Sequence, residues 1–454
     1  MTAGEWITRG ASLLRPALEP RAMASDVSAP ERTPRTTRER LKATLRRHQE
    51  ALSPRVLRRM LTELQAIVDP RASEVEGARL AHAFADWYAK ATPEERRDCW
   101  LLMSEQFAPD PAKVKVARER YEAALGTPEE AHAEIALRRA VQSPRTRLLQ
   151  RFAGFPQGMR FLVDLRAELL PQLKSDRRLL ALDAELESLF STWFDVAFLE
   201  LRTLSWDSPA SLIEKLIKYE AVHEIRSWGD AKNRLDSDRR CYAFFHARLP
   251  DEPLIFVEVA LTGEMSASIT PLLDESAAPA DLVRATTAIF YSISNTQAGL
   301  RGVSFGDSLI KRVVETLKAE FPRLKTFATL SPIPGLRQWM AKNAPASLLA
   351  ALDQPLALGP KSPERAQLLA WAARYLGKET ENGKPCDPVA RFHLGNGARV
   401  ERLNWAADPS PKGVKQSFGL MVNYLYDLKR LDKHRTQLSQ GQIPISSAIE
   451  DLYG

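Results

Sequence analysis

Apolar residues recur at steps of three and four positions from residue 36 to residue 195, which is the period of an amphipathic α-helix. Prolines stand between the periodic segments, so each is expected to end one helix or begin the next. The segment 177–194 gathers leucines and aromatic residues on a single helical face. The pattern predicts an all-α bundle. The prolines are Pro54, Pro70, Pro93, Pro109, Pro128, Pro144 and Pro171, and the apolar face carries Leu179, Leu182, Leu186, Leu189, Phe190 and Trp193.

The pattern changes on both sides of this bundle. Residues 1–35 contain four prolines and no sustained period, and we expect a disordered lead-in there. After Trp206, short runs of β-branched and aromatic residues alternate with turn residues, which is typical of strands. The prediction is an α+β fold, with a helical domain over 36–195 and a mixed α/β domain over 196–454. The expected strands are 241–248, 254–261, 265–270, 287–295 and 325–331, and the later helices are 307–319, 365–375 and 415–428.

Composition limits the classes of protein that remain. The chain has 454 residues, of which 44% are hydrophobic and 27% charged, as in globular proteins with more than one core. No run of eighteen apolar residues occurs, so a membrane span is not expected. Cys99, Cys241 and Cys386 are far apart in the sequence, so neither a disulfide framework nor a structural zinc site is predicted. The acidic residues near the N-terminus are unlike a mitochondrial presequence, and the cytoplasm is the default expectation.

The net charge of +7 and the pI near 9.2 weakly favour an anionic partner. Nucleic acid, anionic lipid and a phosphorylated small molecule all fit the sign of the charge. Because the basic residues are interleaved with acids along the helices, a solvated face with ion pairs is the preferred interpretation. Nucleic acid is therefore not expected as a partner.

A glycine-containing segment at 299–306, GLRGVSFG, lies between a predicted strand and a predicted helix. Main-chain N–H groups at such a turn, together with the helix N-terminus, can bind a phosphate. The segment lacks the Gly-Lys-Ser/Thr ending of a Walker loop and the GxGxxG spacing of a dinucleotide fold. It resembles the pyrophosphate loop of the GNAT acyltransferase superfamily, Arg/Gln-x-x-Gly-x-Gly/Ala. Arg301 and Gly306 match that pattern, whereas Ser304 stands where the pattern has glycine.

A set of ordered motifs between residues 205 and 426 resembles one family, malonyl-CoA decarboxylase. The helical first half also resembles that family's layout, in which an α-helical oligomerisation domain precedes a GNAT-fold catalytic domain. The motifs are AVHEIRSW at 221–228 with Asp230, Lys232 and Arg234, RRCY at 239–242, VALTG at 259–263, AIFYSIS at 288–294, LIKRVV at 309–314, LSPIPG at 330–335, DPVARFH at 387–393 and NW at 404–405.

The resemblance implies a catalytic serine at Ser331 and a catalytic histidine at His393. It also implies an acyl-CoA site, a less distinctive lysine at Lys215, and a homo-oligomer, a dimer or tetramer, built through the helical domain. Malonyl-CoA and acetyl-CoA would be the substrate and product, with coenzyme A as part of the substrate and with no metal or other cofactor. The acyl-CoA site corresponds to Arg301, Gly302, Val303, Ser304, Phe305, Gly306 and Asp307.

These residue types suit the chemistry of decarboxylation. Loss of CO2 from a malonyl thioester leaves electrons on the α-carbon, and the thioester carbonyl can hold them as an enolate without biotin, pyridoxal or a metal. A serine in a proline-stiffened loop can hydrogen-bond the carboxylate or the developing enolate oxygen. A histidine, with an ordinary pKa of ~6.5, can protonate the enolate carbon, so His393 is the expected proton donor.

Other interpretations stay open at this point. Ser331 before a proline could simply form a turn, and a single histidine is more often structural than catalytic. The protein could instead be a CoA-dependent N-acyltransferase, or a non-enzymatic acyl-CoA-binding or interaction protein. Of the other histidines, His223 and His246 are expected to be structural, and His48, His82, His132 and His434 are expected to face solvent.

Overall fold

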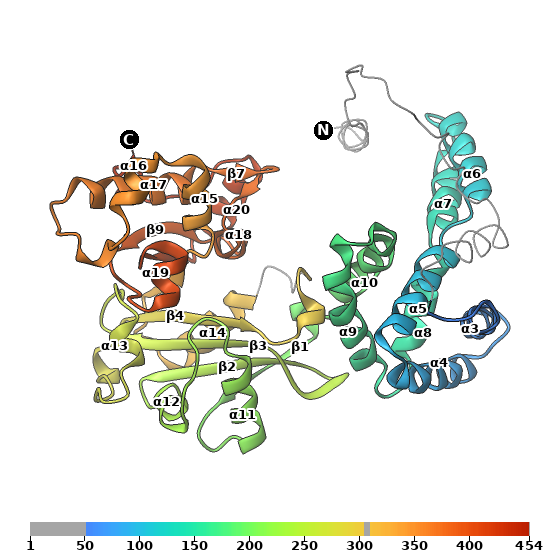
Figure 1. The fold of residues 1–454 in the computed structure, drawn as a ribbon, viewed down its shortest axis with the longest axis horizontal. Helices are drawn as coiled ribbons and strands as arrows, with labels where there is room; N and C mark the ends of the chain where they lie inside the picture. Colours follow the sequence, from blue (N-terminus) through green and yellow to red (C-terminus); the bar gives the residue numbers. More distant parts are fainter. Residues whose placement is uncertain (1–50, 304–308, 454) are drawn as a thin grey trace.

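The structure is a computed structural model that describes residues 51–303 and 309–453. Figure 1 shows two parts side by side, a group of helices from the first half of the chain and a twisted sheet with its own covering helices. The expected lead-in at 1–35 lies outside the described residues. The helical part consists of α3 (Pro54–Ile67), α4 (Glu74–Lys90), α5 (Pro93–Gln106), α6 (Pro111–Ala124), α7 (Glu130–Val141), α8 (Pro144–Ala153), α9 (Gly158–Leu169) and α10 (Leu180–Trp193), with 3-10 turns at Leu170–Lys174 and Arg177–Leu179.

Several of these helices begin at the prolines that the sequence analysis identified as helix starts. Pro54, Pro93 and Pro144 each occupy a first helical position, where the missing N–H of proline costs nothing. The residue before each proline is a serine or threonine whose hydroxyl accepts a main-chain N–H of the first turn. Thr92 and Glu95 form a reciprocal capping box at the start of α5. The prediction that prolines separate the helices is confirmed at these positions.

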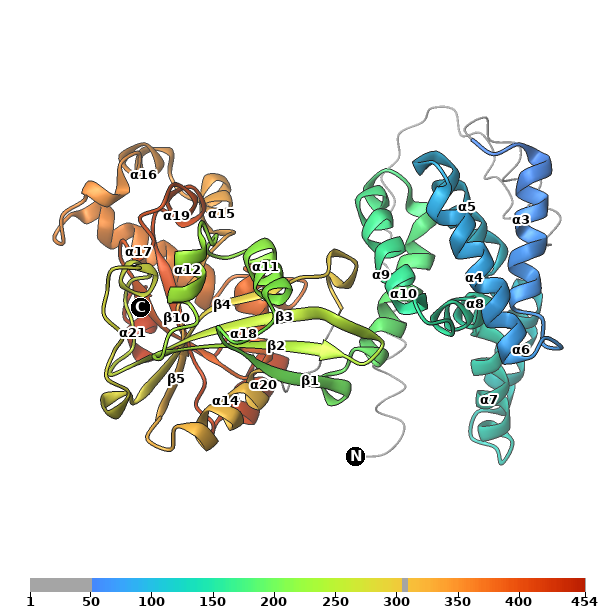
Figure 2. The same cartoon turned by 90° about the horizontal axis from the view of Figure 1, so that it is seen from below.

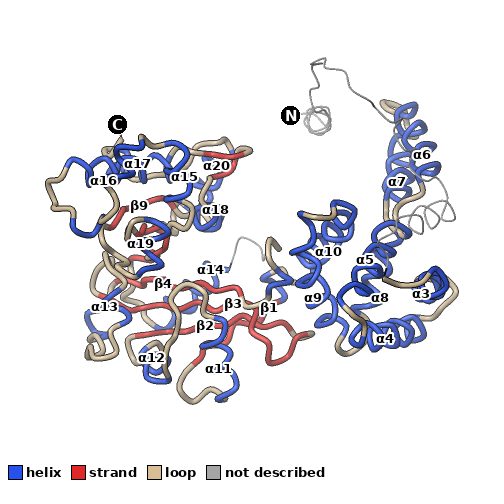
Figure 3. Tube along the Cα trace, viewed as in Figure 1, coloured by secondary structure: helices blue, strands red, loops and turns tan. Residues whose placement is uncertain are grey.

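The second part is built on an eight-stranded mixed sheet with the order β1-β2-β3-β4-β5-β10-β6, with β9 pairing β10. Strands β1 to β4 are antiparallel neighbours, β4 and β5 are parallel, and β10 is antiparallel to β5, β6 and β9. Figure 3 separates these strands from the helices around them. The α+β prediction is therefore confirmed. The strands are β1 (Leu199–Leu204), β2 (Arg239–His246), β3 (Leu249–Thr262), β4 (Thr287–Asn295), β5 (Thr326–Thr329), β6 (Ser331–Pro332), β9 (Arg399–Asn404) and β10 (Met421–Leu425), and β7 (Thr380–Glu381) pairs β8 (Lys384–Pro385) separately.

Helices cover both faces and one end of this sheet, as the two perpendicular views show (Figures 1 and 2). The expected helices at 307–319 and 365–375 are present as α14 and α17. The helices are α11 (Ala210–Tyr219), α12 (Trp228–Asn233), α13 (Thr270–Leu273), α14 (Leu309–Glu320), α15 (Leu336–Asn343), α16 (Ala346–Ala351), α17 (Pro363–Gly377), α18 (Pro388–Gly395), α19 (Pro411–Ser417), α20 (Leu431–Ser439) and α21 (Ser447–Glu450), with 3-10 turns at Val196–Phe198, Leu282–Arg284, Ala298–Leu300 and Pro355–Ala357.

Two predicted elements are wrong. The segment 265–269 is a loop and Thr270 begins α13, because the Arg402 and Asn423 side chains hold the carbonyls of Met265 and Ser266 and no described strand pairs with the segment. The expected helix at 415–428 is instead the end of α19 followed by β10. Phe418 and Gly419 have φ of 57° and 82°, left-handed values that end the helix and turn the chain into the sheet.

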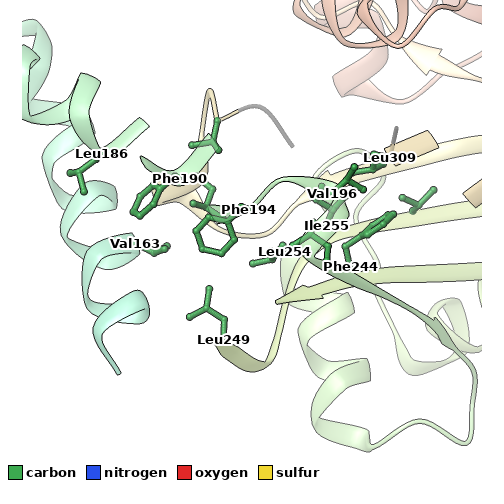
Figure 4. Packing of buried hydrophobic residues seen from close by; sticks show 14 of the residues in the cluster. Val163, Leu186, Phe190, Phe194, Val196, Phe244, Leu249, Leu254, Ile255 and Leu309 are labelled. Atoms are coloured by element: carbon green, nitrogen blue, oxygen red, sulfur yellow. The ribbon is translucent and has the colours of Figure 1, made fainter. Parts of the chain in front are cut away.

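The helical part and the sheet share one continuous core. Phe190 and Phe194, at the end of α10, and Val163 of α9 face Leu249 and Leu254 of β3 (Figure 4). All five side chains are buried. Burying a large apolar side chain stabilises a fold by about 2 kcal/mol, so the contact fixes α9 and α10 against the sheet.

Candidate active site

The Ser331 and His393 side chains, which are 62 residues apart in the sequence, meet at one point of the structure. Ser331 opens β6 and His393 lies in the last turn of α18, and the serine Oγ is 3.2 Å from the histidine Nε2. Both residues are buried, with 5% and 4% of their surfaces exposed. The structure therefore brings together the two residues that the sequence singled out.

The carboxylate of Asp387 explains how the two motifs come together. Its Oδ1 accepts the N–H groups of Val389 and Ala390, at 2.9 and 3.1 Å, and so caps α18. Its Oδ2 accepts the N–H of Gly335, at 3.3 Å, from the loop that follows Ser331. The Asp387 carboxylate thus links the start of α18, which carries His393, to the loop that follows Ser331. Burial raises the pKa of Asp387, while these hydrogen bonds favour its charged form.

Hydrogen bonds extend from the pair on both sides. The Tyr426 hydroxyl is 2.7 Å from His393 Nδ1, and the Ser331 hydroxyl donates to Thr329 Oγ1 at 2.8 Å. Because the serine proton is used toward Thr329, the bond to His393 is best formed by an N–H at Nε2. Nδ1 then accepts from the tyrosine. This arrangement assigns one tautomer, with the proton on the nitrogen next to Ser331.

His393 is neutral in this environment. Burial lowers its pKa to about 3, because no nearby acid compensates for the lost hydration of the imidazolium. The ring stacks on Tyr424, with a centroid distance of 4.7 Å, and burial also raises the pKa of Tyr426. The Tyr426 phenol therefore keeps its proton, which agrees with its role as donor to Nδ1.

A cavity of about 230 Å³ opens beside the pair. Its walls are the end of β4, the beginning of β6, and the face of α18 that carries His393. Apolar side chains form most of the lining, which favours a site from which water is excluded. The residues that line it are Val222, Ile255, Phe290, Tyr291, Ser292, Ile293, Asn295, Ser331, Pro332, Pro388, Val389, Phe392 and His393.

The β4 strand offers free main-chain groups along this cavity. Parallel pairing with β5 stops at Phe290 and Thr329, and Leu330 N–H closes it on the Phe290 carbonyl at 3.0 Å. Beyond that point β4 continues to Asn295 with β3 alone as its partner strand. Within the described part of the chain, the side of β4 that faced β5 forms no further main-chain hydrogen bond over 291–295. An extended amide-containing ligand could therefore bind there as an added strand.

The predicted acyl-CoA loop begins where β4 ends, after the 3-10 turn Ala298–Leu300. Arg301 is exposed, Val303 is buried, and Gly302 has φ of 82°, a left-handed value that favours glycine. The expected residues Ser304, Phe305, Gly306 and Asp307 lie outside the described residues. The part of the loop that is described thus has the strand-to-turn placement that the sequence predicted.

Lys215 and His434 lie elsewhere than the sequence analysis suggested. Lys215 is not a lining residue of the cavity, and its ammonium binds Glu252 at 2.8 Å and the Asp251 carbonyl at 2.7 Å. His434 was expected to face solvent, and that prediction is wrong, because its ring is buried with Nδ1 2.9 Å from the Gly397 carbonyl. His82 and His132 are exposed as predicted, and His48 lies outside the described residues.

Sequence reasoning missed Tyr424, Tyr426 and Thr329. The tyrosines were placed in the predicted helix 415–428, where positions two apart point in different directions. In a strand, positions 424 and 426 share a face, and both contact His393. Correct assignment of β10 would have revealed this pairing.

Two kinds of site were searched for outside this cavity. Across residues 51–303 and 309–453, no group of three or more histidine, cysteine, aspartate or glutamate side chains is placed to hold a metal ion. In the same residues no helix combines the length and the apolar character that crossing a membrane requires. A larger hollow of about 790 Å³ lies between α4 and α8, but none of the motif residues lines it.

Comparisons with known proteins point to a single family along most of the chain. A family model described as the malonyl-CoA decarboxylase C-terminal domain matches residues 197–453, and one described as the N-terminal domain matches residues 107–194. The mitochondrial malonyl-CoA decarboxylase of Rattus norvegicus is 38% identical over 335 residues, which is 65% of this chain and 68% of that protein. The enzyme of the same name from Anser anser anser is 37% identical over 330 residues, 63% of this chain and 65% of that protein.

Solved structures give the same result over a longer span. The crystal structure of malonyl-CoA decarboxylase from Rhodopseudomonas palustris has 41% identity and a TM-score of 0.78, covering 87% of this chain and 99% of that one. The structure of malonyl-CoA decarboxylase from Agrobacterium vitis has 42% identity and a TM-score of 0.78, covering 87% of this chain and all of that one, 100%.

Proposed function

The chain belongs to the malonyl-CoA decarboxylase family, as the sequence motifs predicted, and on that premise we propose that it converts malonyl-CoA into acetyl-CoA and CO2. The observation that carries the proposal is the hydrogen-bonded Ser331–His393 pair at the wall of a largely apolar cavity. A reaction that forms a carbanion is favoured by an apolar site with one well-placed proton donor, and a largely apolar lining beside His393 fits that need.

The substrate would bind along the end of β4. Its pantetheine arm carries two amides, which match the free main-chain groups of 291–295, and its diphosphate would lie at the turn around Gly302. This placement brings the malonyl group to the Ser331–His393 pair at the inner end of the strand. Holding the thioester there aligns the bond to be broken with the carbonyl π system.

Binding of the substrate would convert His393 into the acid. An ionised malonyl carboxylate next to His393 raises the pKa of the imidazole, because an opposite charge favours the charged form. The ring then takes up a proton on Nδ1, and the Tyr426 hydroxyl, 2.7 Å away, turns from donor to acceptor. His393 is thus neutral in the empty pocket and cationic when malonyl-CoA occupies it.

The chemical step balances with these groups and the one proton that His393 takes up from water. The bond between the α-carbon and the carboxylate breaks, CO2 leaves, and the electron pair passes to the thioester as an enolate. The proton on His393 Nε2 then moves to the α-carbon, forming the methyl group of acetyl-CoA and leaving a neutral imidazole with its proton on Nδ1. After product release, Nε2 takes a proton from water and Nδ1 returns its own to water, so each turnover consumes one solvent proton and restores the resting tautomer. Ser331, at 3.2 Å from Nε2, hydrogen-bonds the carboxylate or the enolate oxygen during this step.

The remaining predictions belong to the same proposal. We expect the enzyme to act without a metal or another cofactor, and to assemble as a dimer or tetramer through the helical domain. A cytoplasmic location stays a prediction, since the curated relatives from goose and rat are named mitochondrial.

Incubating the purified protein with malonyl-CoA and no acceptor tests the function. Acetyl-CoA should accumulate, and in deuterated water its methyl group should carry one solvent-derived deuterium. Turnover only after addition of an amine would instead identify a CoA-dependent N-acyltransferase. Binding without turnover under either condition would identify a non-enzymatic acyl-CoA-binding protein and overturn the proposal.

A further inference from the structure

We infer that Arg166, a residue of helix α9, is a positioning residue for the turn at residues 299–303, here called the coenzyme turn, so that the helical part of the molecule contributes to the acyl-CoA site. The inference rests on the proposed function. It assigns α9 a part in substrate binding besides any part in subunit assembly.

The Arg166 guanidinium reaches across the boundary between the two parts of the molecule. Its Nη1 donates to the carbonyls of Gly299 and Arg301, at 2.8 and 2.9 Å. Its Nε donates to Asp183 of α10 at 2.8 Å, and Nη2 lies 3.7 Å from Glu187. Only 1% of the arginine surface is exposed. A buried guanidinium with these partners has one orientation, because its donors form a rigid planar fork.

This contact fixes the direction of the peptide that precedes Gly302. In a trans peptide the C=O and N–H groups point in opposite directions. Since Arg166 holds the Arg301 carbonyl on the α9 side, the Gly302 N–H points away from α9. Within the described residues that N–H donates to no protein acceptor. The arginine thus orients a free donor of the kind that binds a phosphate oxygen.

The same stretch of chain is docked on α9 at two more points. Arg160 donates to the Gln297 side chain at 2.6 Å, and Gln297 in turn donates to the Pro253 carbonyl at 3.1 Å. A Cβ atom on Gly299 would lie 1.9 Å from the Val163 carbonyl, so only glycine allows this approach. Val163 lies at this boundary in Figure 4. The turn therefore takes its position from α9 over several residues.

Replacing Arg166 should separate coenzyme binding from chemistry. In Arg166→Met, KM for malonyl-CoA and the Kd of acetyl-CoA measured by calorimetry should both rise about tenfold, with kcat changed less than about threefold. The truncated substrate malonyl-N-acetylcysteamine has no phosphates, so its kcat/KM should equal the wild-type value. Arg166→Lys keeps the positive charge but lacks the planar set of guanidinium donors, so it should recover part of the affinity for acetyl-CoA.

Arg145→Met is the matched control. Arg145 is also a buried arginine of the helical part that donates to carbonyls, those of Met103, Ser104 and Ala181, but it does not contact the turn. Its replacement should leave the Kd of acetyl-CoA unchanged. If Arg166→Met is unstable, the isosteric Asp183→Asn variant, which weakens the same clamp, should still raise KM for malonyl-CoA a few-fold.

Two outcomes would overturn the inference. Equal loss of activity toward malonyl-CoA and the truncated substrate would mean that Arg166 serves only the fold, and unchanged values for both would mean that it has no role. Failure of the proposed function looks different, because the wild-type protein would then turn over neither substrate. In that case the acetyl-CoA affinities of the variants still decide the role of Arg166.

Discussion

The cavity beside Ser331 and His393 lies along the unpaired edge of β4 and the turn around Gly302 follows the end of that strand, yet the two are built in opposite ways. Side chains make the cavity, where Ser331, His393 and Tyr426 are buried and linked by hydrogen bonds. Main chain makes the turn, where Arg301 and Gly302 are exposed. Burial keeps the imidazole neutral, and under the proposed function an anionic substrate would protonate it, whereas the diphosphate would need only oriented N–H groups.

This difference implies that substitutions in the two regions should affect different kinetic constants. Changes in the cavity should lower kcat, because its groups act on the transition state. Changes at the turn should raise KM, because its groups contact a part of the substrate that does not react.

The largest effect is expected for His393→Asn. Loss of the proton donor should lower kcat about a thousandfold, while the Kd of acetyl-CoA stays within about threefold of the wild-type value. Steady-state assays with malonyl-CoA and calorimetry with acetyl-CoA measure the two quantities. Unchanged turnover would show that His393 is not the proton donor.

The proton taken up with the substrate gives a second test of the same residue. Near pH 7, binding of a malonyl-CoA analogue that keeps the carboxylate but cannot lose CO2 should be accompanied by proton uptake, and acetyl-CoA binding should not, because acetyl-CoA brings no carboxylate. Calorimetry in buffers of different ionisation enthalpy measures the uptake. Equal values for the two ligands would contradict the proposed protonation of His393.

A smaller loss is expected for Ser331→Ala. The variant removes one hydrogen bond to the reacting group but leaves the imidazole and its bond to Tyr426, so kcat should fall roughly tenfold to a hundredfold. Ser292→Ala is the comparison variant, since Ser292 also lines the cavity but donates to Glu220. A decrease in kcat as small as that of Ser292→Ala would indicate that Ser331 has only a structural role.

At the turn, Gly302→Val should raise KM for malonyl-CoA about tenfold with little change in kcat. A Cβ atom at Gly302 meets no neighbour, so the effect comes from the left-handed backbone, which a β-branched residue strongly disfavours. Gly126, in the helical part, also has a left-handed φ of 74°, so Gly126→Val is the matched control for backbone strain alone. A fall in kcat equal to that of the control, with no change in KM, would contradict the placement of the diphosphate.

The smallest effect concerns stability and pH. Burial lowers the folded-state pKa of His393 to about 3, below the ~6.5 of an unfolded histidine. The unfolded state therefore binds more protons below pH 6.5, and stability is lost as the pH falls. In His393→Asn, the drop in unfolding free energy between pH 7 and pH 5 should be smaller by about 2 kcal/mol. Chemical denaturation measures it, and the exposed His132→Asn is the control.

Part of the site could be predicted from short segments. The glycines are a local physical signal for the turn at 302, whereas Ser331 and His393 were predicted because the SPIPG and DPVARFH motifs resemble those of the family. The contacts around these residues could not be predicted in the same way. Thr329 ends β5 and Tyr426 directly follows β10, where its N–H bonds to the Phe327 carbonyl, and the pairing of these strands depends on the whole sheet. The wrongly predicted helix at 415–428 hid the face that Tyr424 and Tyr426 share.

By itself, the sequence determined the helical first half and the α+β second half, since proline positions and periodicity act over a few residues, and its motifs determined the family and so the candidate residues Ser331 and His393. The tertiary structure decided the rest. It set the 3.2 Å contact of Ser331 with His393, the burial that makes the imidazole neutral, and the reach of Arg166 into the turn. Each of these depends on packing between segments far apart in the chain, which no local pattern records.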